Sequence, residues 1–244
     1  MTRALLLAAG LGTRLRPLTD ATPKCLVPIA GRSLLDYWFD LLFAAGIERV
    51  LVNTSYLAQA VRDHLAGSPW RDRVDLVHET ALLGTGGSVL ANRAYFGDAA
   101  FLVIHADNLS DCDVAGLLTA HARRPPGCAI TMLAFRTDQP RLCGILECDQ
   151  NGVLQAFHEK VPDPPGNLAN AAVYVFEPEV IAFIAATGQA TVDLSTEVIP
   201  RFLGRILVLE HPGYHRDIGT PESLAQARAD AAGGRLRHAA GGRG

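Results

Sequence analysis

The chain has 244 residues, of which 49% are hydrophobic and 19% charged, and its formal net charge is −3. This composition provides enough apolar residues for a sizeable core and excludes an intrinsically disordered chain. The mild acidity argues against a protein that binds nucleic acid, because such proteins usually carry a basic face.

The N-terminal apolar run, residues 4–9, ends at Gly10 and predicts a buried strand. Its six residues are fewer than the roughly 7–15 of a signal-peptide core. No stretch approaches the ~20 apolar residues that a membrane-spanning helix needs. We therefore expect a cytoplasmic protein without a membrane partner.

The cysteines are odd in number and scattered, and no two of them form a C-x-x-C pair. This spacing favours neither a zinc site nor a disulfide framework. We expect reduced thiols, as in most cytosolic proteins. The five positions are Cys25, Cys112, Cys128, Cys143 and Cys148.

Strands and helices alternate through the first half of the chain. Ser33 can cap a helix whose apolar residues recur at helical spacing. This alternation predicts an α/β fold, a Rossmann-like three-layer arrangement with a mainly parallel mixed sheet covered on both faces. The predicted elements are strand 3–9, helix 34–45, strand 49–53, helix 56–65, strand 74–77, helix 89–95 and strand 100–105.

The second half predicts a smaller lobe with a mixed sheet, in which residues 149–152 form a hairpin turn. Residues 220–222, Thr-Pro-Glu, begin a last helix. We expect one domain over residues 1–230 and a disordered Gly/Ala/Arg-rich tail over residues 231–244. The other elements predicted here are strands 128–135, 144–148, 153–157, 169–176, 205–210 and 214–217, and helices 178–185 and 195–203.

The loop after the first predicted strand has the composition of a phosphate-binding loop. Gly10 and Gly12 let the backbone approach a phosphate and donate N–H groups to it. Arg14 can donate paired hydrogen bonds to phosphate oxygens, and Lys24 adds a second cation. A glycine turn alone is weak evidence. Leu15 stands where the dinucleotide fingerprint has its third glycine, which argues against a dinucleotide-dependent oxidoreductase.

Residues 10–28 read GLGTRLRPLTDATPKCLVP. They resemble the signature of the sugar-phosphate nucleotidyltransferases, G-x-G-T-R-L-x-P-x-T-x-x-x-P-K-x-x-x-P, with every fixed position filled. The glycine loop at 83–87 resembles in particular that of guanylyltransferases acting on mannose or manno-heptose 1-phosphate. The resemblance extends over about residues 1–228 and includes Asp107, residues 157–160, Asn170 and residues 217–221.

The resemblance implies an enzyme in which a sugar 1-phosphate attacks the α-phosphorus of an NTP in line and pyrophosphate leaves. The nucleophile is already an anion, so catalysis would rest on positioning and charge neutralisation. Arg14 would stabilise the leaving β- and γ-phosphates. Lys24 would hold the α-phosphate or the incoming phosphate.

The resemblance also implies that Asp107 and Asp217 hold Mg²⁺, a cation that prefers oxygen ligands. Asp107 ends an apolar strand, and by itself it would be read as a helix cap or loop acid. His105 shares its strand face. The role of His105 stays open between a metal ligand and a packed side chain, of which we favour the second.

The residues implied to bind the nucleotide surround the first strand and the glycine loop. A glutamate can accept hydrogen bonds from N1–H and the exocyclic amine of guanine, which favours GTP without excluding UTP. The set comprises Ala8, Ala9, Gly10, Gly12, Thr13, Glu79, Gly84 and Thr85.

Four residues of the second half are implied to bind the sugar phosphate: Gly144, Glu159, Lys160 and Asn170. Gly144 would allow a close approach of the sugar, and Glu159 and Asn170 would contact its hydroxyl groups. The alternative for Glu159 and Lys160 is an ordinary surface ion pair.

The expected partners are an NTP and a sugar 1-phosphate, and a homo-oligomer is left open. The alternatives are a uridylyl- or thymidylyltransferase, an enzyme with a polyol or alkyl phosphate acceptor, and a non-catalytic regulatory protein that binds an NDP-sugar. The retained Arg14, Lys24, Asp107 and Asp217 argue against the last. We expect no additional acyltransferase domain after the final helix.

Overall fold

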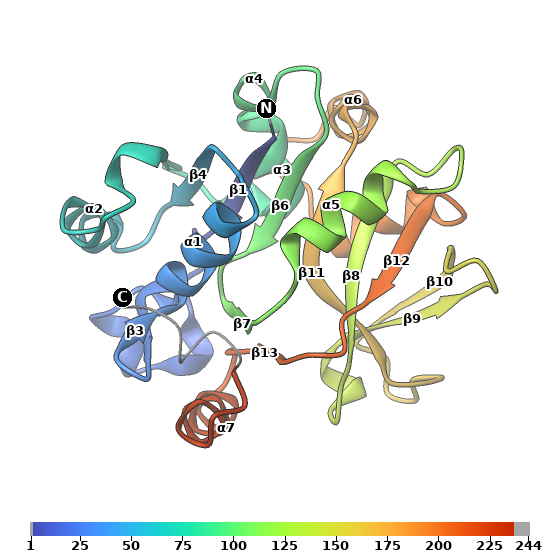
Figure 1. Cartoon of the computed structure of the whole chain (residues 1–244). Coiled ribbons are helices and arrows are strands. Elements are labelled where there is room, and N and C mark those ends of the chain that lie inside the picture. Colours follow the sequence, from blue (N-terminus) through green and yellow to red (C-terminus); the bar gives the residue numbers. More distant parts are fainter. Residues whose placement is uncertain (1, 237–244) are drawn as a thin grey trace. The chain divides into compact units, whose positions relative to one another are not determined.

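The structure, a computed structural model, describes residues 2–236. Contacts between Cα atoms divide the chain into two compact units, each built from separate segments (Figure 1). The first unit contains Leu82–Ile104, Val114–Pro212 and the residues up to Leu5. The second unit contains Leu6–Ala81, His105–Asp113 and the segment from Gly213 onward. The predicted single domain over residues 1–230 stays a prediction.

Strand β11 (Leu168–Phe176) is central to the sheet of the first unit, where it pairs antiparallel with β6, β8 and β9. Strand β10 continues this sheet antiparallel to β9, and β12 runs parallel to β8. The neighbouring strands are β6 (Phe101–His105), β8 (Ile130–Arg136), β9 (Gly144–Cys148), β10 (Leu154–Glu159) and β12 (Ile206–Glu210).

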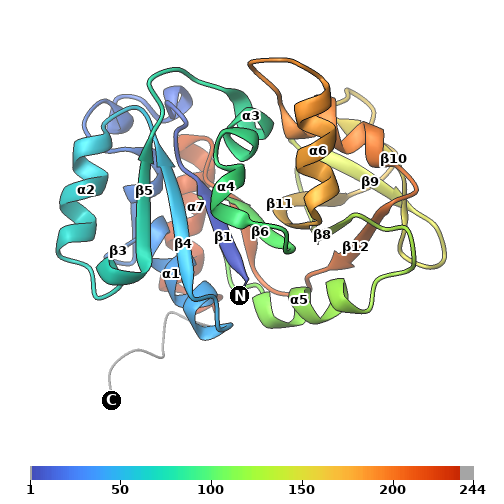
Figure 2. The same cartoon turned by 90° about the horizontal axis from the view of Figure 1, so that it is seen from above.

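Helices cover both faces of this sheet. Helix α5 (Val114–Ala122) packs on β8, β11 and β12. Helices α3 (Gly84–Ala91) and α6 (Pro178–Ala186) contact each other and lie on the opposite face (Figure 2). Because apolar strands are thereby covered on both sides, the first unit has the three layers of an α/β/α protein. The predicted fold class is confirmed.

In the second unit, β4 (Arg49–Thr54) runs parallel to β5 (Val74–His78), with Val50 opposite Val74. Strand β1 (Arg3–Leu7) passes from the first unit into the second at Leu6. The other elements are β2 (Pro28–Ile29), β3 (Arg32–Ser33), α1 (Leu34–Ala44), α2 (Ala58–Ala66), β7 (Asn108–Ser110), β13 (His215–Asp217) and α7 (Pro221–Ala232).

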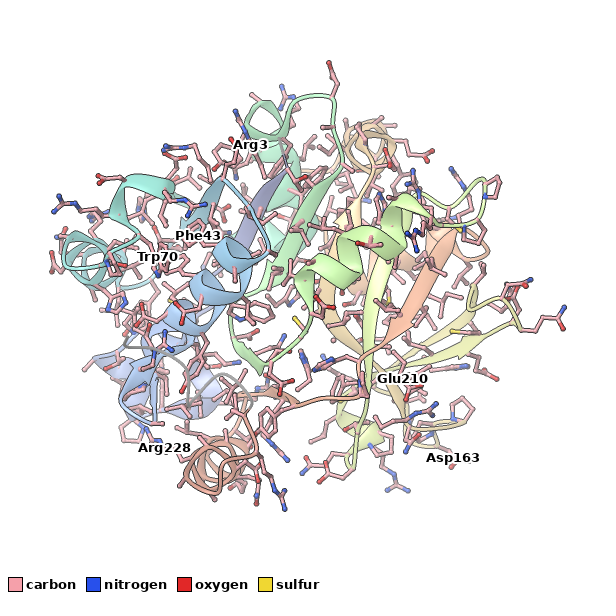
Figure 3. All side chains as sticks on the ribbon, in the orientation of Figure 1. Arg3, Phe43, Trp70, Asp163, Glu210 and Arg228 are labelled. Carbon is pink, nitrogen blue, oxygen red and sulfur yellow. The ribbon has the colours of Figure 1, made fainter. Side chains whose placement is uncertain are left out.

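Two local features fix the helices of the second unit. Ser33 caps α1 as predicted, and the Asp36 carboxylate accepts a hydrogen bond from the Ser33 backbone N–H in a capping box. Phe43 and Trp70 lie together (Figure 3), with ring centroids 4.7 Å apart. The Arg73 guanidinium lies 4.0 Å from the centre of the Phe43 ring. This stack fixes the connection between α2 and β5 against α1.

An apolar cluster in the second unit joins the N-terminal loops to β7, β13 and α7. It includes Leu15, Leu109 and Ile218. Each of them follows a predicted site residue by one or two positions in the sequence. Burying these side chains fixes the backbone from which their neighbours project. The full cluster is Leu15, Val27, Ile29, Leu34, Tyr37, Leu109, Ile218, Leu224, Ala227, Ala231 and Leu236.

The short strands β2, β3 and β7 have no counterpart among the predicted elements, and three further departures concern helices. Helix α3 begins at Gly84, so the glycine-rich segment forms the first turn of a helix instead of a loop. Helix α5 has no counterpart among the predicted elements. The predicted helix 195–203 is a π-helical turn (Leu194–Val198) followed by a 3-10 turn (Ile199–Phe202). Pro200, which has no N–H to donate, explains that interruption.

The last described residues are ordered by contacts. Helix α7 extends to Ala232, Leu236 is 3% exposed within the apolar cluster, and Arg235 pairs with Asp230. The rest of the predicted tail, residues 237–244, lies outside the described residues. All five cysteines are free, as predicted. Within residues 2–236, none of the helices has the length and apolarity needed to cross a bilayer.

Candidate active site

The loop after β1 is a series of short 3-10 turns: Thr13–Leu15, Leu18–Asp20 and Lys24–Leu26. Gly12 has a φ of +62°, and a Cβ at this position would lie 2.9 Å from Cγ2 of Thr19. The Thr19 hydroxyl donates to the Gly12 carbonyl over 2.8 Å. Gly12 is therefore required by both backbone conformation and space.

Lys24 is 9% exposed and lies between two acids that are distant in sequence. Its Nζ atom lies 2.7 Å from Asp107 Oδ2 and 3.4 Å from Asp217 Oδ1. Burial alone would lower the pKa of Lys24, but the two carboxylates outweigh burial and raise the pKa above its ordinary value. Lys24 is therefore a charged ammonium.

A two-stranded ladder places the two acids. Asp107 directly precedes β7, and Asp217 ends β13, opposite Asn108. The backbone N–H of Ile218 donates to the Asp107 carbonyl over 3.1 Å. Because Leu109 and Ile218 are buried in the apolar cluster, the ladder has little freedom to shift. Burial by itself would raise the pKa of Asp107, but the charges of Lys24 and His105 outweigh burial and lower the pKa.

Arg14 reaches the same group of side chains through Gly219. A Cβ at Gly219 would lie 2.9 Å from Arg14 Nη2 and 2.8 Å from Asp217 Oδ2. The guanidinium and the carboxylate therefore both lie next to the position that a side chain at residue 219 would occupy. The sequence analysis did not include Gly219 among the site residues. The available signal was its position two residues after a candidate metal ligand.

The donor set at this site suits a divalent cation that carries other ligands with it. Within the described part of the chain, no group of three His, Cys, Asp or Glu side chains could hold a metal ion. Asp107 and Asp217 do converge on one point, where Lys24 Nζ lies. Mg²⁺ is commonly held by one or two carboxylates together with water and substrate phosphates. The two acids fit that pattern, and an ion bound there would compete with the Lys24 ammonium.

Glu79 follows β5 and belongs to a buried network at the ends of the second unit's strands. Its backbone N–H donates to the Thr54 carbonyl over 2.7 Å. Asn53 donates from Nδ2 to Glu79 Oε1 over 3.0 Å, and its Oδ1 accepts from the Ala8 N–H over 2.7 Å. Ala8 and Glu79, which are both predicted to bind the nucleotide, are thus joined by Asn53, a residue that was not predicted from the sequence.

The other residues of the loop after β1 that are predicted to bind the nucleotide are more accessible to solvent. Gly10 and Thr13 are exposed, and Ala9 lies at the border of the core. A Cβ at Gly10 would meet nothing within 4 Å. Gly10 therefore has room around it that the structure does not fill.

In the first unit, Gly84 and Thr85 make contacts that a purely structural role would explain. A Cβ at Gly84 would lie 2.4 Å from the Val192 carbonyl oxygen. The Thr85 hydroxyl donates to Asp193 Oδ2 over 3.1 Å and accepts from the Leu194 N–H over 2.7 Å. Close packing against residues 190–194 therefore explains this glycine.

The predicted sugar-phosphate residues of the first unit lie on β9, β10 and β11, except Lys160, which directly follows β10. Gly144 is opposite Glu159 in the ladder, and a Cβ at Gly144 would lie 2.6 Å from Glu159 Oε2. Lys160 Nζ pairs with Glu159 Oε1 at 2.9 Å. Lys160 has a φ of +50°, an unfavourable value for a residue with a side chain.

Asn170 is held by its own strand. Its Nδ2 donates to the Tyr174 hydroxyl over 2.7 Å, and its Oδ1 accepts from the Ala172 N–H over 2.9 Å. Burial raises the pKa of Tyr174, and the charges of Glu159 and Asp193 add to the effect.

The family is decided by a match to almost the whole chain. The model of the family described as nucleotidyl transferase matches residues 3–233. The chain belongs to this family. The chain also uses lysine at two positions only, Lys24 and Lys160.

Several relatives are similar in sequence. A mannose-1-phosphate guanylyltransferase of Mycobacterium tuberculosis is 35% identical over 232 residues, which cover 93% of this chain and 64% of that protein. The catalytic subunit beta of the Drosophila melanogaster mannose-1-phosphate guanylyltransferase is 31% identical, over 91% of this chain and 61% of that protein. A UTP–glucose-1-phosphate uridylyltransferase of Synechocystis is 30% identical, over 82% of this chain and 55% of that protein. The chain thus spans less than two thirds of these relatives.

Solved structures share the fold. A putative glucose-1-phosphate thymidylyltransferase of Bacillus anthracis, in complex with sucrose, has a TM-score of 0.83 at 20% identity, covering 94% of both chains. HddC of Yersinia pseudotuberculosis, complexed with GMP-PN, has a TM-score of 0.78 at 24% identity, covering 94% of this chain and 99% of that one.

Proposed function

We propose that this protein is a sugar-1-phosphate nucleotidyltransferase, which converts an NTP and a sugar 1-phosphate to an NDP-sugar and pyrophosphate. The observation that carries the proposal is the position of Lys24, buried between Asp107 and Asp217, with Arg14 close to Asp217 across Gly219. Two cations and two hard-oxygen ligands are the groups that a transfer between phosphates requires.

In the proposed reaction, an oxygen of the sugar 1-phosphate forms a bond to the α-phosphorus. The bond from that phosphorus to the α,β-bridging oxygen breaks, and pyrophosphate leaves with the electron pair. Arg14 stabilises the charge that develops on the β- and γ-phosphates, and Lys24 holds the α-phosphate or the incoming phosphate. No side chain has to remove a proton, because the nucleophile is already ionised.

Asp107 and Asp217 hold Mg²⁺ in this proposal. The support is chemical, since two carboxylates converge on one point, where Lys24 Nζ lies. When bound, the ion supplies positive charge to the phosphate oxygens. With the acids held by the ion, the Lys24 ammonium would be available to the phosphates.

The nucleotide binds to the loop after β1, through Ala8, Ala9, Gly10, Gly12 and Thr13. Glu79 reads the base. A carboxylate accepts from the N1–H and the 2-amino group of guanine, which makes GTP the favoured substrate. Similarity to two mannose-1-phosphate guanylyltransferases supports this choice. The alternative is UTP or dTTP, supported by the similarity to the Synechocystis uridylyltransferase.

Gly84 and Thr85 are retained in the proposal as nucleotide-binding residues. Thr85 occupies the first turn of α3, where backbone N–H groups have no partner within the helix. The contacts of Gly84 with Val192 and of Thr85 with Asp193 hold that turn in place.

The sugar 1-phosphate is bound by Gly144, Glu159, Lys160 and Asn170. Glu159 accepts hydrogen bonds from sugar hydroxyls, and Asn170 accepts from them or donates to them. Lys160 pairs with the phosphate. The unfavourable backbone conformation of Lys160 supports a functional demand at this position. A manno-configured hexose or heptose is favoured, in line with the relatives named for mannose 1-phosphate.

The reaction is placed in the cytoplasm, where NTPs are made and the five free thiols stay reduced. Its partners are the NTP and the sugar 1-phosphate, and its product supplies polysaccharide biosynthesis. A non-catalytic, NDP-sugar-binding protein is the alternative of another class. It would have no need of the acids and cations around Lys24.

The proposal is tested by pyrophosphate release. Purified protein is incubated with Mg²⁺ and each of GTP, UTP, dTTP, CTP and ATP. Each mixture receives mannose, glucose, N-acetylglucosamine, N-acetylmuramic acid or manno-heptose 1-phosphate. The proposal expects release for one pair above all others, abolished by EDTA and by Asp107→Ala. No release from any pair by folded protein would refute it.

A further inference from the structure

Asn53 is a buried polar residue that joins three strand ends in the second unit. It lies near the end of β4 and is 1% exposed. Ala8 follows β1, and Glu79 follows β5. A buried amide is costly unless its polar atoms are hydrogen-bonded, so its presence here calls for a structural or functional reason.

The two contacts of Asn53 fix its orientation. Oδ1 accepts from the backbone N–H of Ala8 over 2.7 Å, and Nδ2 donates to Glu79 Oε1 over 3.0 Å. A backbone N–H can only donate and an ionised carboxylate can only accept. The amide therefore has one arrangement that satisfies both neighbours. No other side chain of similar size offers an acceptor and a donor at these positions.

Glu79 is 7% exposed, so the orientation of its carboxylate depends on the groups packed around it. The Glu79 N–H is bound to the Thr54 carbonyl, which fixes the backbone, and Asn53 then fixes the side chain relative to Ala8. A recognition group works best when its neighbours limit its rotation. Asn53 performs this task without being the recognition group.

We propose that Asn53 is the positioning residue for base selection: it orients the Glu79 carboxylate relative to the Ala8 backbone, so that a purine with a 2-amino group is preferred. This inference rests on the proposed role of Glu79 as the base-reading residue. It adds a residue whose effect is on discrimination between nucleotides rather than on the transfer itself.

The test compares dissociation constants of GTP and ITP, measured by calorimetry, for the full chain. ITP differs from GTP only in lacking the 2-amino group. Asn53→Leu keeps the number and branching of the side-chain heavy atoms and removes both hydrogen bonds. Asn53→Asp keeps the acceptor for Ala8 but sets a carboxylate against Glu79. Thr54→Val is the matched control, because Thr54 is also buried in β4 and its hydroxyl donates to the Val77 carbonyl over 3.1 Å.

We expect the wild type and Thr54→Val to prefer GTP over ITP by the same factor. Both Asn53 variants should lose that preference by roughly tenfold, the size of one hydrogen bond to a charged group. In a double-mutant cycle, Asn53→Leu and Glu79→Gln should be non-additive, since each removes the same recognition.

The outcomes separate the two proposals. Unchanged GTP preference in both Asn53 variants, or equal loss in Thr54→Val, overturns the positioning role of Asn53. Additive effects with Glu79→Gln also overturn it. A wild type that binds GTP selectively but transfers nothing to any sugar 1-phosphate refutes the proposed function while the positioning role is still decided by the binding data. A wild type with no preference for GTP overturns the positioning role.

Discussion

Lys24 and Asp107 lie 83 positions apart in the chain, and their side chains meet at 2.7 Å between Nζ and Oδ2. Asp217 approaches the same ammonium from 193 positions away. In this structure the Lys24 ammonium pairs with both acids. Were a divalent ion held by Asp107 and Asp217, the ammonium would be available to bind phosphate in the proposed reaction.

Lys24→Met is expected to strengthen metal binding while weakening catalysis. Without the ammonium, the two carboxylates have no competitor for a cation, and Mn²⁺ should bind the nucleotide-free protein about tenfold more tightly. The electron paramagnetic resonance signal of free Mn²⁺ measures this affinity. The same variant should lose about 100-fold or more in kcat, because a group that stabilises the transition state is gone.

Lys160→Met serves as the control for that experiment, since Lys160 belongs to the first unit and pairs with Glu159. Its Mn²⁺ affinity should equal that of the wild type. Weaker Mn²⁺ binding in Lys24→Met would contradict the competition between the ammonium and the metal.

Gly219→Ala should reduce kcat by roughly tenfold or more with a small effect on folding. The added Cβ would lie within 3.0 Å of both Arg14 Nη2 and Asp217 Oδ2, so these side chains must move apart. Gly166→Ala is the matched control, because nothing lies within 4 Å of its Cβ. Steady-state kinetics and urea unfolding measure the two quantities. Equal kcat in both variants would show that the spacing of Arg14 and Asp217 is unimportant.

Lys160→Gly separates a surface ion pair from a substrate contact. Glycine adopts the φ of +50° without penalty, so the substitution should stabilise the fold by about 1 kcal/mol. The KM for the sugar 1-phosphate should nevertheless rise roughly tenfold, with little change in the KM for the NTP. Chemical denaturation and two-substrate kinetics are the measurements. Unchanged kinetics alongside the gain in stability would mean that the Lys160–Glu159 pair has no role in binding.

The second unit should lose a stabilising contact as pH rises through the neutral range. His64 on α2 lies 3.0 Å from Asp36 Oδ1, next to the cap of α1. The hydrogen bond to Asp36 raises the pKa of His64 above its ordinary value of 6.5. The charged pair is therefore fully present below that value and is lost as pH rises through the higher folded-state pKa.

We expect the difference in unfolding free energy between wild type and His64→Gln to be larger at pH 5.5 than at pH 8.5. Urea titrations at the two pH values measure it. A difference that does not change with pH would contradict the assignment, because glutamine cannot gain or lose a proton.

The sequence predicted the fold class and brought attention to four residues that the structure places together, Arg14, Lys24, Asp107 and Asp217. The apolar strands and glycine turns suffice to predict the fold class. The motif of fixed spacing suffices to single out Arg14 and Lys24. The sequence could not reveal that Lys24 is buried between the acids. That contact depends on the β7–β13 ladder, which pairs segments about a hundred residues apart.

Other errors have identifiable causes. The glycines of residues 84–87 suggested a loop, but the segment begins helix α3 because it packs against residues 190–194. Helix α5 escaped detection because its sequence, VAGLLTAHA, is apolar on most sides and has a glycine inside. Asn53 was overlooked because an asparagine at a strand end usually marks a turn, and only the structure places its amide between Ala8 and Glu79.

The most direct test of the account is the identity of both products. ³¹P nuclear magnetic resonance follows a mixture of protein, Mg²⁺, GTP and mannose 1-phosphate, with the preferred pair from the pyrophosphate panel used in its place if different. We expect NDP-sugar and pyrophosphate in equal amounts, and neither product with Asp107→Asn or Asp217→Asn. Release of nucleoside monophosphate and pyrophosphate without any NDP-sugar, or unchanged transfer by both variants, would contradict it.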